Sequence, residues 1–336
     1  MQYVKGDILT TEGFKRGYLG VERGKKAEIY KGLPPEKPLA AGLIVPTFIN
    51  AHTHLGDSFI KYKNLKLPRN VVKLVAPPNG LKHRLLKKAS ERELINGMEK
   101  SIKILKETGT SHFCDFREDG IKGIFQLHKA LERNTINSII LSRPLEFKYE
   151  KNEMRLLLKN SDGIGLSSIS DWEYSEIEKI SKHTKKEGKI FALHASEVVR
   201  EDIDLILDLH PDFLVHMISA TESDLYNVKD AKIPIVICPR SSSFFKLKIN
   251  LELMKKTGVN LLLGTDNGML NFPDVIKEVQ HLKNSSNVFS TEELLNMVTY
   301  TPRKVLNLVD CIKGPNLSGS FVVLDRGSLK PIYISK

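Results

Sequence analysis

The sequence predicts an α/β protein in which a (β/α)8 TIM barrel carries a small β-sandwich formed by both chain ends. Two observations support the barrel. Short β-prone runs recur eight times, and after the first run their starts fall roughly every 21 to 28 residues, with helix-like segments between them. The runs are also continuously apolar, as expected for parallel strands that are buried on both faces. The β-prone character of both termini indicates that the two chain ends pair in a small sheet beside the barrel.

The expected elements can be placed in order along the chain. The barrel strands are residues 42–50, 110–116, 137–144, 162–168, 189–195, 212–217, 233–239 and 259–266. Helix signals stand between them, because Ser90 and Glu93 have the spacing of a capping box, and Gly109 and Gly188 are placed to end two helices. We therefore expect the barrel to occupy residues 44–314. The small sandwich is expected to consist of residues 1–43 and 315–336.

The composition is that of an ordinary globular protein. The 336 residues are 41% hydrophobic and 27% charged, and no stretch approaches the ~18 consecutive apolar residues of a membrane span. The amino terminus lacks the basic-then-apolar layout of a signal peptide, so we expect a cytoplasmic location. Cys114, Cys238 and Cys311 form no CxxC pair, which argues against a disulfide framework and against a cysteine zinc site.

The net charge of +11 is compatible with a nucleic-acid partner, with an anionic substrate or with a lysine-rich surface. The lysines are mostly spread over helix-like segments and interleaved with glutamates, which favours a solvated surface. We therefore expect a small-molecule partner rather than a nucleic acid or a membrane, and homo-oligomerisation stays open.

Candidate metal ligands follow several of the predicted strands. His52 and His54 are two residues apart after the first apolar run, so their side chains project to the same side. His194 ends the fifth strand, His216 the sixth and Asp266 the eighth. Each residue alone has an ordinary explanation as a core histidine or a turn residue. In a parallel barrel, however, the carboxyl ends of the strands build one active site, so these residues are expected to converge.

Six motifs stand in an order that resembles a known family. They are NAHTHLGDS (50–58), LHASE (193–197), VHM (215–217), CPRSSSFF (238–245), LGTDN (263–267) and the terminal TPRKVLNL (301–308) with GSFVVLD (319–325). This constellation resembles the amidohydrolase superfamily and its aminohydrolase branch, which includes S-adenosylhomocysteine and methylthioadenosine deaminases, guanine deaminases and chlorohydrolases. The resemblance spans nearly the whole chain and implies a metal-dependent barrel flanked by a small β-sandwich, so the sandwich form expected for the terminal sheet rests on this resemblance.

The resemblance also implies residue roles. His52, His54, His194 and Asp266 match the ligands of a single divalent ion. Zn²⁺ is the expected ion and Fe²⁺ the alternative, because imidazole and carboxylate ligands accept both. The fourth strand offers no lysine that a second ion would need.

Two further matches concern catalysis. His216 matches the histidine that contacts the reacting water or the substrate, and Glu197 matches the proton-shuttling glutamate. The chain departs from the family at Ser242, where relatives commonly have asparagine.

Other polar residues near the expected site are candidates for binding the substrate. Arg117 and Arg143 end the second and third strands and are placed to bind an anionic or carbonyl group, although Arg117 equally suits an ion pair that braces the barrel end. Arg240 is a candidate to contact either the substrate or a carboxylate. Trp172 is expected to pack near the rim or to stack on a planar ring.

A basic segment follows the first barrel strand. Residues 58–90 contain nine Lys or Arg residues and no Asp or Glu. A long loop at a catalytic face often forms a lid or a pocket wall. The segment is then either a solvated basic edge or a lid in which Lys82 and Arg84 bind a negative group of the substrate.

The function predicted from these residues is the metal-dependent hydrolytic deamination of a nitrogen heterocycle, such as a purine nucleoside, a nucleobase or a pterin. Metal hydroxide is expected to attack the ring and release ammonia, with Glu197 as proton shuttle, His216 orienting the hydroxide and Asp266 accepting its remaining proton. One alternative is another hydrolase of the same fold that cleaves a cyclic amide or a different ring substituent. A second alternative is a non-catalytic barrel that binds anions or RNA.

Overall fold

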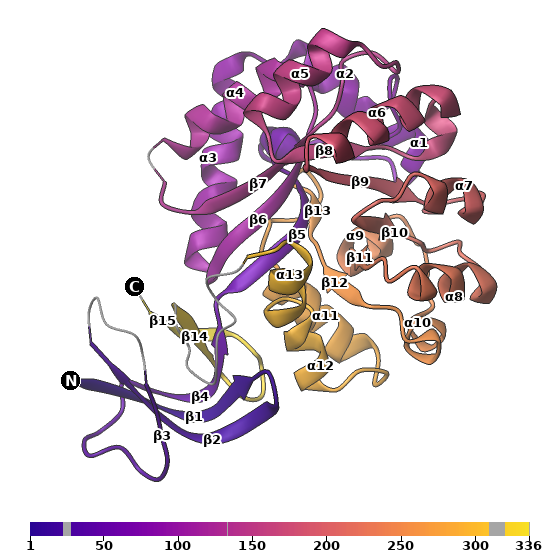
Figure 1. The fold of residues 1–336 in the computed structure, drawn as a ribbon. Coiled ribbons are helices and arrows are strands. Elements are labelled where there is room, and N and C mark those ends of the chain that lie inside the picture. Colours follow the sequence, from indigo (N-terminus) through magenta and orange to yellow (C-terminus); the bar gives the residue numbers. More distant parts are fainter. Residues whose placement is uncertain (23–27, 133, 309–319, 336) are drawn as a thin grey trace.

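The computed structural model describes residues 1–22, 28–132, 134–308 and 320–335 (Figure 1). Its larger sheet is parallel, with nine strands in the order β12-β11-β10-β9-β8-β7-β6-β5-β13. These strands are β5 (Phe48–His54), β6 (Thr110–Arg117), β7 (Asn137–Ser142), β8 (Gly163–Leu166), β9 (Ile190–Ala195), β10 (Phe213–His216), β11 (Ile235–Ile237), β12 (Leu261–Leu263) and β13 (Asp266–Asn267). Every predicted run overlaps at least one of them, so the predicted series of strands is confirmed.

The sheet curls until its two edge strands meet within one chain segment, where only Gly264 and Thr265 separate β12 from β13. The amide of Gly264 donates to the carbonyl of Ile237, and the amide of Thr265 donates to the carbonyl of His52. A Cβ atom at Gly264 would lie 2.6 Å from the Cβ of His52, so this close approach requires glycine. The ladder is open between β12 and β13, so the sheet is TIM-barrel-like rather than the regular closed barrel that was predicted.

Helices surround the outer face of the curled sheet (Figure 1). They are α3 (Glu91–Glu107), α4 (Gly120–Leu131), α5 (Lys151–Asn160), α6 (Tyr174–Lys186), α7 (Ile203–Asp208), α8 (Glu222–Asp230), α9 (Pro239–Phe244), α10 (Leu251–Thr257), α11 (Ile276–Ser285), α12 (Thr291–Asn296) and α13 (Tyr300–Val305). The capping box of Ser90 and Glu93 begins α3 as predicted, and Gly109 follows its end with φ at +87°.

Alternating side chains of the strands supply two apolar cores. On β6, Cys114 and Phe116 belong to the cluster inside the curled sheet, whereas Phe113 belongs to the cluster between the sheet and the helices. Cys114 and Cys238 are buried free cysteines, and Cys311 lies outside the described residues. The cores hold the strand ends that carry the candidate site.

The two chain ends pair in a separate sheet of six strands, in the order β15-β14-β4-β1-β2-β3. These strands are β1 (Gln2–Thr10), β2 (Gly13–Val21), β3 (Glu28–Tyr30), β4 (Ala40–Pro46), β14 (Phe321–Leu324) and β15 (Pro331–Ile334). All neighbours are antiparallel except β1 and β4. The predicted pairing of the ends is therefore present, but in a single sheet instead of a sandwich.

The predicted first barrel strand, residues 42–50, is divided between the two sheets. Residues up to Pro46 belong to β4, and β5 begins at Phe48. The amide of Thr47 donates to Ser320 of the small sheet, and the amide of Phe48 donates to Gly109 beside the barrel. Proline has no N–H to continue a ladder, which suits the change of sheet after Pro46. The predicted boundary at 43/44 falls inside β4, and the one at 314/315 lies outside the described residues.

The basic segment lies over the carboxyl end of β5 and contains three short helices. They are the 3-10 helix η1 (Leu55–Lys63), α1 (Val71–Leu74) and α2 (Leu81–Lys88). Among the described residues, no helix combines the length and the apolar character that a membrane span needs.

Candidate metal centre and substrate pocket

The four predicted metal ligands meet at the carboxyl edge of the larger sheet. His52 and His54 lie at the end of β5, His194 lies in β9 and Asp266 begins β13. The Nε2 atom of His194 lies 3.2 Å from that of His52 and 3.4 Å from that of His54. The Oδ1 atom of Asp266 lies 3.4 Å from Nε2 of His52 and 3.6 Å from Nε2 of His54. Three imidazole nitrogens and one carboxylate oxygen therefore point at one small region.

Hydrogen bonds behind two of the rings fix which nitrogen faces this region. Nδ1 of His54 lies 3.1 Å from the carbonyl oxygen of Phe116, and Nδ1 of His194 lies 2.8 Å from that of Leu166. A carbonyl only accepts, so each Nδ1 carries the proton and each Nε2 presents a lone pair. Burial lowers the pKa of His54 to about 3 and holds the pKa of His194 well below its usual value. Neutral imidazoles whose lone pairs converge beside a carboxylate fit a divalent metal ion.

His216 and Glu197 lie beside these ligands. His216 ends β10, and its Nε2 lies 3.7 Å from Oε1 of Glu197. The Nδ1 atom of His216 is buried and has no hydrogen-bond partner among the described residues. Burial, with a smaller contribution from the charge of Asp266, raises the pKa of Glu197 to about 8. The carboxyl group of Glu197 can therefore hold and release a proton near neutral pH.

Left-handed backbone conformations occur beside three of the site's strands. Ser196, His216 and Asp266 have φ values of +46°, +78° and +59°. Such conformations cost non-glycine residues roughly 1 to 3 kcal/mol and persist where the surrounding structure imposes them. They turn the chain sharply at the strand ends, so the polar side chains are held at the mouth of the curled sheet.

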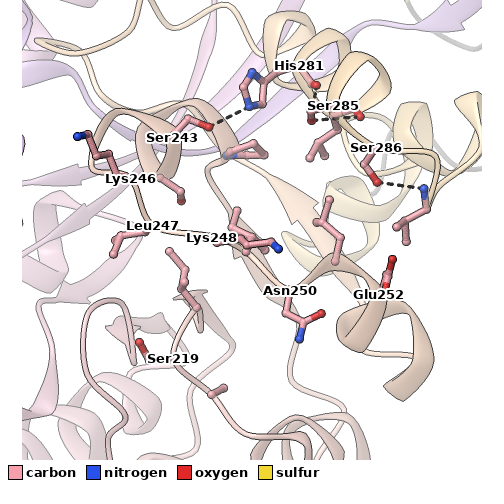
Figure 2. Close-up of a pocket in the computed structure, with 18 of the residues that line it drawn as sticks. Ser219, Ser243, Lys246, Leu247, Lys248, Asn250, Glu252, His281, Ser285 and Ser286 are labelled. Atoms are coloured by element: carbon pink, nitrogen blue, oxygen red, sulfur yellow. Dashed lines mark hydrogen bonds between the residues drawn. The ribbon is translucent and has the colours of Figure 1, made fainter.

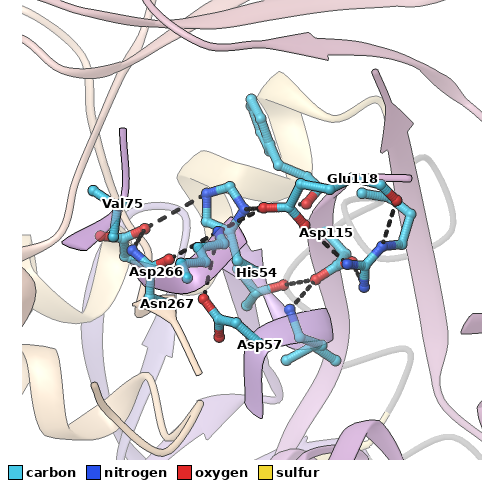
Figure 3. A network of polar contacts seen from close by, with 12 residues as sticks. His54, Asp57, Val75, Asp115, Glu118, Asp266 and Asn267 are labelled. Carbon is cyan, nitrogen blue, oxygen red and sulfur yellow. Dashed lines mark hydrogen bonds and ion pairs between the residues drawn. The ribbon is translucent and has the colours of Figure 1, made fainter. Parts of the chain in front are cut away.

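A second layer of polar side chains supports the ligands (Figure 3). Oε1 of Glu118 lies 3.0 Å from Nδ1 of His54, and Ser241 donates to Oδ2 of Asp266 at 2.5 Å. Nδ2 of Asn267 donates to Oδ1 of Asp266 at 2.9 Å. No spacing pattern in the sequence marks this layer, because its members come from separate segments. Only Asn267 could have been suspected from the sequence as a member of this layer, because it directly follows the predicted ligand Asp266.

Two charged residues in this layer stabilise each other. Burial alone would lower the pKa of Lys82, but the carboxylates of Glu118 and Asp57 outweigh that effect and raise it. Burial alone would raise the pKa of Glu118, but Lys82 and His54 hold it well below its usual value. Lys82 and Glu118 are therefore an ion pair at neutral pH, with a distance of 2.5 Å between Nζ and Oε1.

A pocket of about 230 Å³ opens over the ligands. Its floor contains the predicted catalytic and ligand residues His54, His194, Glu197, His216 and Asp266. Apolar side chains from the basic segment and from the loop after β9 form its walls, namely Val71, Val72, Val75, Ala76, Pro77, Val198 and Val199. A planar ring between such walls would lose water on both faces while its edge meets the polar floor.

Two of the six predicted substrate-binding residues line this pocket. The half-buried Arg143 is one, and its guanidinium makes no hydrogen bond or ion pair with any described residue. Lys82 is the other, but its ammonium is engaged by Glu118 and Asn267. Arg84 is exposed and does not line the pocket.

The remaining three predicted substrate-binding residues do not line the pocket and contact other residues of the protein. The guanidinium of Arg117 is buried and contacts Glu118 at 2.9 Å and Asp115 at 3.4 Å, which is the bracing alternative. The indole of Trp172 donates to Ser167 at 3.0 Å and packs against Phe147. Neither side chain lines the pocket, so neither is placed to contact a bound ring.

Arg240 pairs with a buried carboxylate. Its Nε lies 2.6 Å from Oε1 of Glu278, and its guanidinium also donates to the carbonyl of Phe272 at 3.0 Å. Ser242, where the chain departs from its relatives, donates to the carbonyl of Cys238 inside α9. The neighbouring Ser241 donates to Asp266.

Replacing Arg240 with methionine is expected to destabilise the fold without preventing substrate binding. The change leaves Glu278 buried and unpaired, so the free energy of unfolding should fall by roughly 2 to 3 kcal/mol. Urea unfolding measures this loss, and the exposed Arg84→Met is the matched control, expected to change stability by less than about 0.5 kcal/mol. A large rise in KM for Arg240→Met with normal stability would contradict the structural role.

A second, larger hollow of about 1280 Å³ lies between the loop after β10, α9, α10 and α11. Figure 2 shows Ser243 and His281 facing each other across part of it, with Oγ and Nε2 3.0 Å apart. None of the candidate ligands lines this hollow.

The fold and the site together define the class of the protein: a TIM-barrel-like sheet with histidines and an aspartate gathered at its carboxyl edge, as in metal-dependent barrel hydrolases. The sequence model of the amidohydrolase family matches residues 43–312. The chain belongs to the amidohydrolase family. Enzymes of this family are metal-dependent, in agreement with the His-His-Asp cluster seen here.

Relatives and solved structures agree with this membership. A protein of Methanocaldococcus jannaschii, MJ0699, is 34% identical over 325 residues, which are 90% of this chain and 81% of that protein. A 5-methylthioadenosine/S-adenosylhomocysteine deaminase of Caldicellulosiruptor saccharolyticus is 23% identical over 311 residues, covering 80% of this chain and 66% of that enzyme.

Two deaminase structures share the fold. A 5-methylcytosine deaminase of Klebsiella pneumoniae liganded with 5-fluorocytosine has a TM-score of 0.74 at 13% identity, covering 97% of this chain and 92% of that one. An adenosine deaminase of Xanthomonas campestris with bound zinc has a TM-score of 0.72 at 15% identity, covering 96% and 84%. The chain is thus an amidohydrolase-family hydrolase, and the deaminases among its relatives and neighbours support action on C–N bonds.

Proposed function

We propose that the protein is a mononuclear metal-dependent deaminase that releases ammonia from a small nitrogen heterocycle. The observation that carries the proposal is the convergence of His52, His54, His194 and Asp266 on one region of the floor of a pocket that Glu197 also lines. Relatives and neighbours named as deaminases support the same chemistry.

The donor set suits one divalent ion, with Zn²⁺ as the first candidate and Fe²⁺ as the second. Such an ion supplies Lewis-acid activation of water near neutral pH. The described residues contain two groups of converging donors, His52 with His194 and His216, and His52 with His54 and Asp266; the groups share His52, so the proposal assigns one ion to each chain.

The residues around this centre divide the proton transfers between them. Glu197 would take a proton from the attacking water and deliver it to a ring nitrogen, because its raised pKa lets it exist in both forms near neutral pH. His216 lies next to Glu197 and would orient the attacking water. Asp266 would accept the second proton of the water and pass it to the amino group, which then leaves as ammonia while the ring carbon keeps the oxygen.

The shape of the pocket favours a compact substrate. Its volume of about 230 Å³ is below the ~300 to 1,000 Å³ of pockets for drug-sized ligands. The apolar walls suit a planar ring, and Arg143 is available to bind a carbonyl or anionic substituent. We therefore rank ring systems of nucleobase or pterin size above nucleosides with long substituents.

Replacing Arg143 with methionine is expected to raise KM for a substrate that carries such a substituent. One lost charge-assisted hydrogen bond should cost about 1.5 to 3 kcal/mol, or roughly 10- to 100-fold in KM. Turnover at saturation should change much less, because a remote contact is made equally in the ground state and the transition state. An unchanged KM would remove Arg143 from the proposed pocket chemistry.

The function is tested by measuring ammonia release from a panel of purines, pyrimidines, pterins and nucleosides with protein of known metal content. Ammonia formed stoichiometrically with an oxo product supports deamination. Opening of a cyclic amide without ammonia release would instead identify another hydrolase of the same fold. Salt-dependent RNA binding without turnover of any compound would favour a non-catalytic barrel.

A further inference from the structure

Lys82 differs from every other cation of the basic segment in its burial and its partners. It lies in the first turn of α2 and is only 3% exposed, whereas Arg84, Lys87 and Lys88 of the same helix are exposed. Its Nζ lies 2.5 Å from Oε1 of Glu118, 3.0 Å from Oδ1 of Asn267 and 3.4 Å from Oδ2 of Asp57. An ammonium group has three N–H donors, and three acceptors surround it here.

This arrangement argues against a contact between Lys82 and a substrate. Its ammonium makes a short ion pair with Glu118, a hydrogen bond to Asn267 and a longer ion pair with Asp57, so a substrate anion would have to compete with two carboxylates for it. The nearest carboxylates also compensate the lysine charge inside a buried layer. The ammonium is thus better placed to act on the residues that it touches than on the pocket.

Two of these partners make polar side-chain contacts with candidate metal ligands. Oε1 of Glu118, which accepts from Lys82, also lies 3.0 Å from Nδ1 of His54. Asn267 accepts from Lys82 through Oδ1, and its Nδ2 donates to Oδ1 of Asp266 at 2.9 Å. The lysine therefore fixes the orientation of the Asn267 amide, because the oxygen faces the ammonium and the NH₂ group must face the aspartate.

The two linked ligands lie on adjacent strands at the opening of the sheet. His54 is the register partner of Asn267 in the short pairing of β5 with β13. Asp266 precedes Asn267 in β13, and the ladder is interrupted between β12 and β13. A two-residue strand has few hydrogen bonds of its own, so side chains must help to hold Asp266 against β5.

We propose that Lys82 is a positioning residue of the metal centre, which holds His54 through Glu118 and Asp266 through Asn267. This inference rests on the metal centre of the proposed function but is independent of the substrate. It also gives the basic segment a structural role. When α2 packs over β5, its buried Lys82 contacts the two residues that hold the ligands His54 and Asp266. Loss of the ammonium then weakens metal binding even though Lys82 is not a ligand.

The test compares the Zn²⁺ affinity of purified variants by competition with a chromogenic chelator. Lys82→Met keeps the apolar stem and removes the three donors, so its affinity is expected to fall roughly 10- to 100-fold, the usual effect of losing a support of a metal ligand. The exposed Lys87→Met on the same helix is the matched control and should bind Zn²⁺ as the wild type does. Wild-type affinity in Lys82→Met would overturn the inference.

A second variant guards against a folding failure, because Lys82→Met removes the nearby cation of the buried Asp57 and leaves Glu118 with Arg117 as its ion-pair partner. Asn267→Ala removes one link and leaves Lys82 paired with Glu118, so it should fold and still lose Zn²⁺ affinity. Because both changes break the same chain to Asp266, the double variant should lose less than the product of the two single losses. Fully multiplicative losses would show that Lys82 does not act through Asn267.

Two further readouts separate positioning from general packing. A packing role would lower the unfolding temperature of the chelator-treated protein while leaving Zn²⁺ affinity intact. If Lys82 positions the ligands, added Zn²⁺ should raise the unfolding temperature of Lys82→Met by less than that of the wild type. The visible absorption of the Co²⁺-loaded variant should also differ from that of the wild type. If the wild type binds no divalent ion, the proposed function fails together with this inference. If the wild type binds Zn²⁺ and the variants bind it equally well, only this inference fails.

Discussion

Replacing His194 with alanine is expected to remove the bound divalent ion and to lower turnover by at least ~1,000-fold. Nε2 of His194 lies within 3.4 Å of Nε2 of both His52 and His54, so its loss opens the centre of the donor cluster. A catalytic ion supplies several kcal/mol of transition-state stabilisation, and each ~1.4 kcal/mol corresponds to a tenfold change in rate. Elemental analysis and steady-state kinetics of the same preparation measure both effects.

The matched control is His210→Asn. His210 is exposed and has φ at +49°, a conformation that asparagine tolerates, so the variant should keep its metal content and turnover. The wild type should contain close to one ion per chain and lose activity on chelation. Two tightly bound ions per chain in active protein would contradict the mononuclear centre.

Glu197→Gln is expected to lower turnover by at least ~100-fold while the metal content stays unchanged. The amide matches the carboxyl group in size but cannot carry a proton between water and ring, and general acid–base catalysis is worth ~100- to 10,000-fold. Because Glu197 is not one of the converging ligands, metal analysis of the variant should match that of the wild type. This combination distinguishes a proton shuttle from a metal ligand.

Glu187→Gln, at the exposed end of α6, makes the same chemical change away from the pocket and should leave turnover unaltered. Near-normal turnover in Glu197→Gln would reject the proposed proton transfers. Loss of metal in that variant would instead make Glu197 part of the metal centre.

Local patterns made much of the fold and of the ligand set predictable. Apolar runs of strand length marked β5 to β12, and the capping box at Ser90 marked the start of α3. His54, His194 and Asp266 could be grouped because each follows or ends such a run. The division of residues 42–50 into two strands was not predicted, since β4 and β5 are both apolar and only Thr47 separates them.

Sequence patterns could not predict the ion pairs and hydrogen bonds that surround the metal ligands and the pocket. Arg117 and Arg240 carry the positive charge and lie in the sequence positions expected of substrate-binding residues. Only their distances to Glu118 and Glu278 show that they form ion pairs within the protein. Lys82 was indistinguishable in the sequence from the exposed Arg84, two residues away. The helical rotation of α2 buries one and exposes the other.

The sequence by itself determined the strand series and which residue types end each strand. Both are local properties, because strand formation depends on short apolar runs and parallel strands bring their carboxyl ends to one edge. The tertiary structure alone decided which charges are paired, where the pocket opens and how the ligands are supported. Those outcomes depend on contacts such as that between Lys82 and Asn267, which are 185 residues apart in the chain, and no periodicity in the sequence reports such a distance.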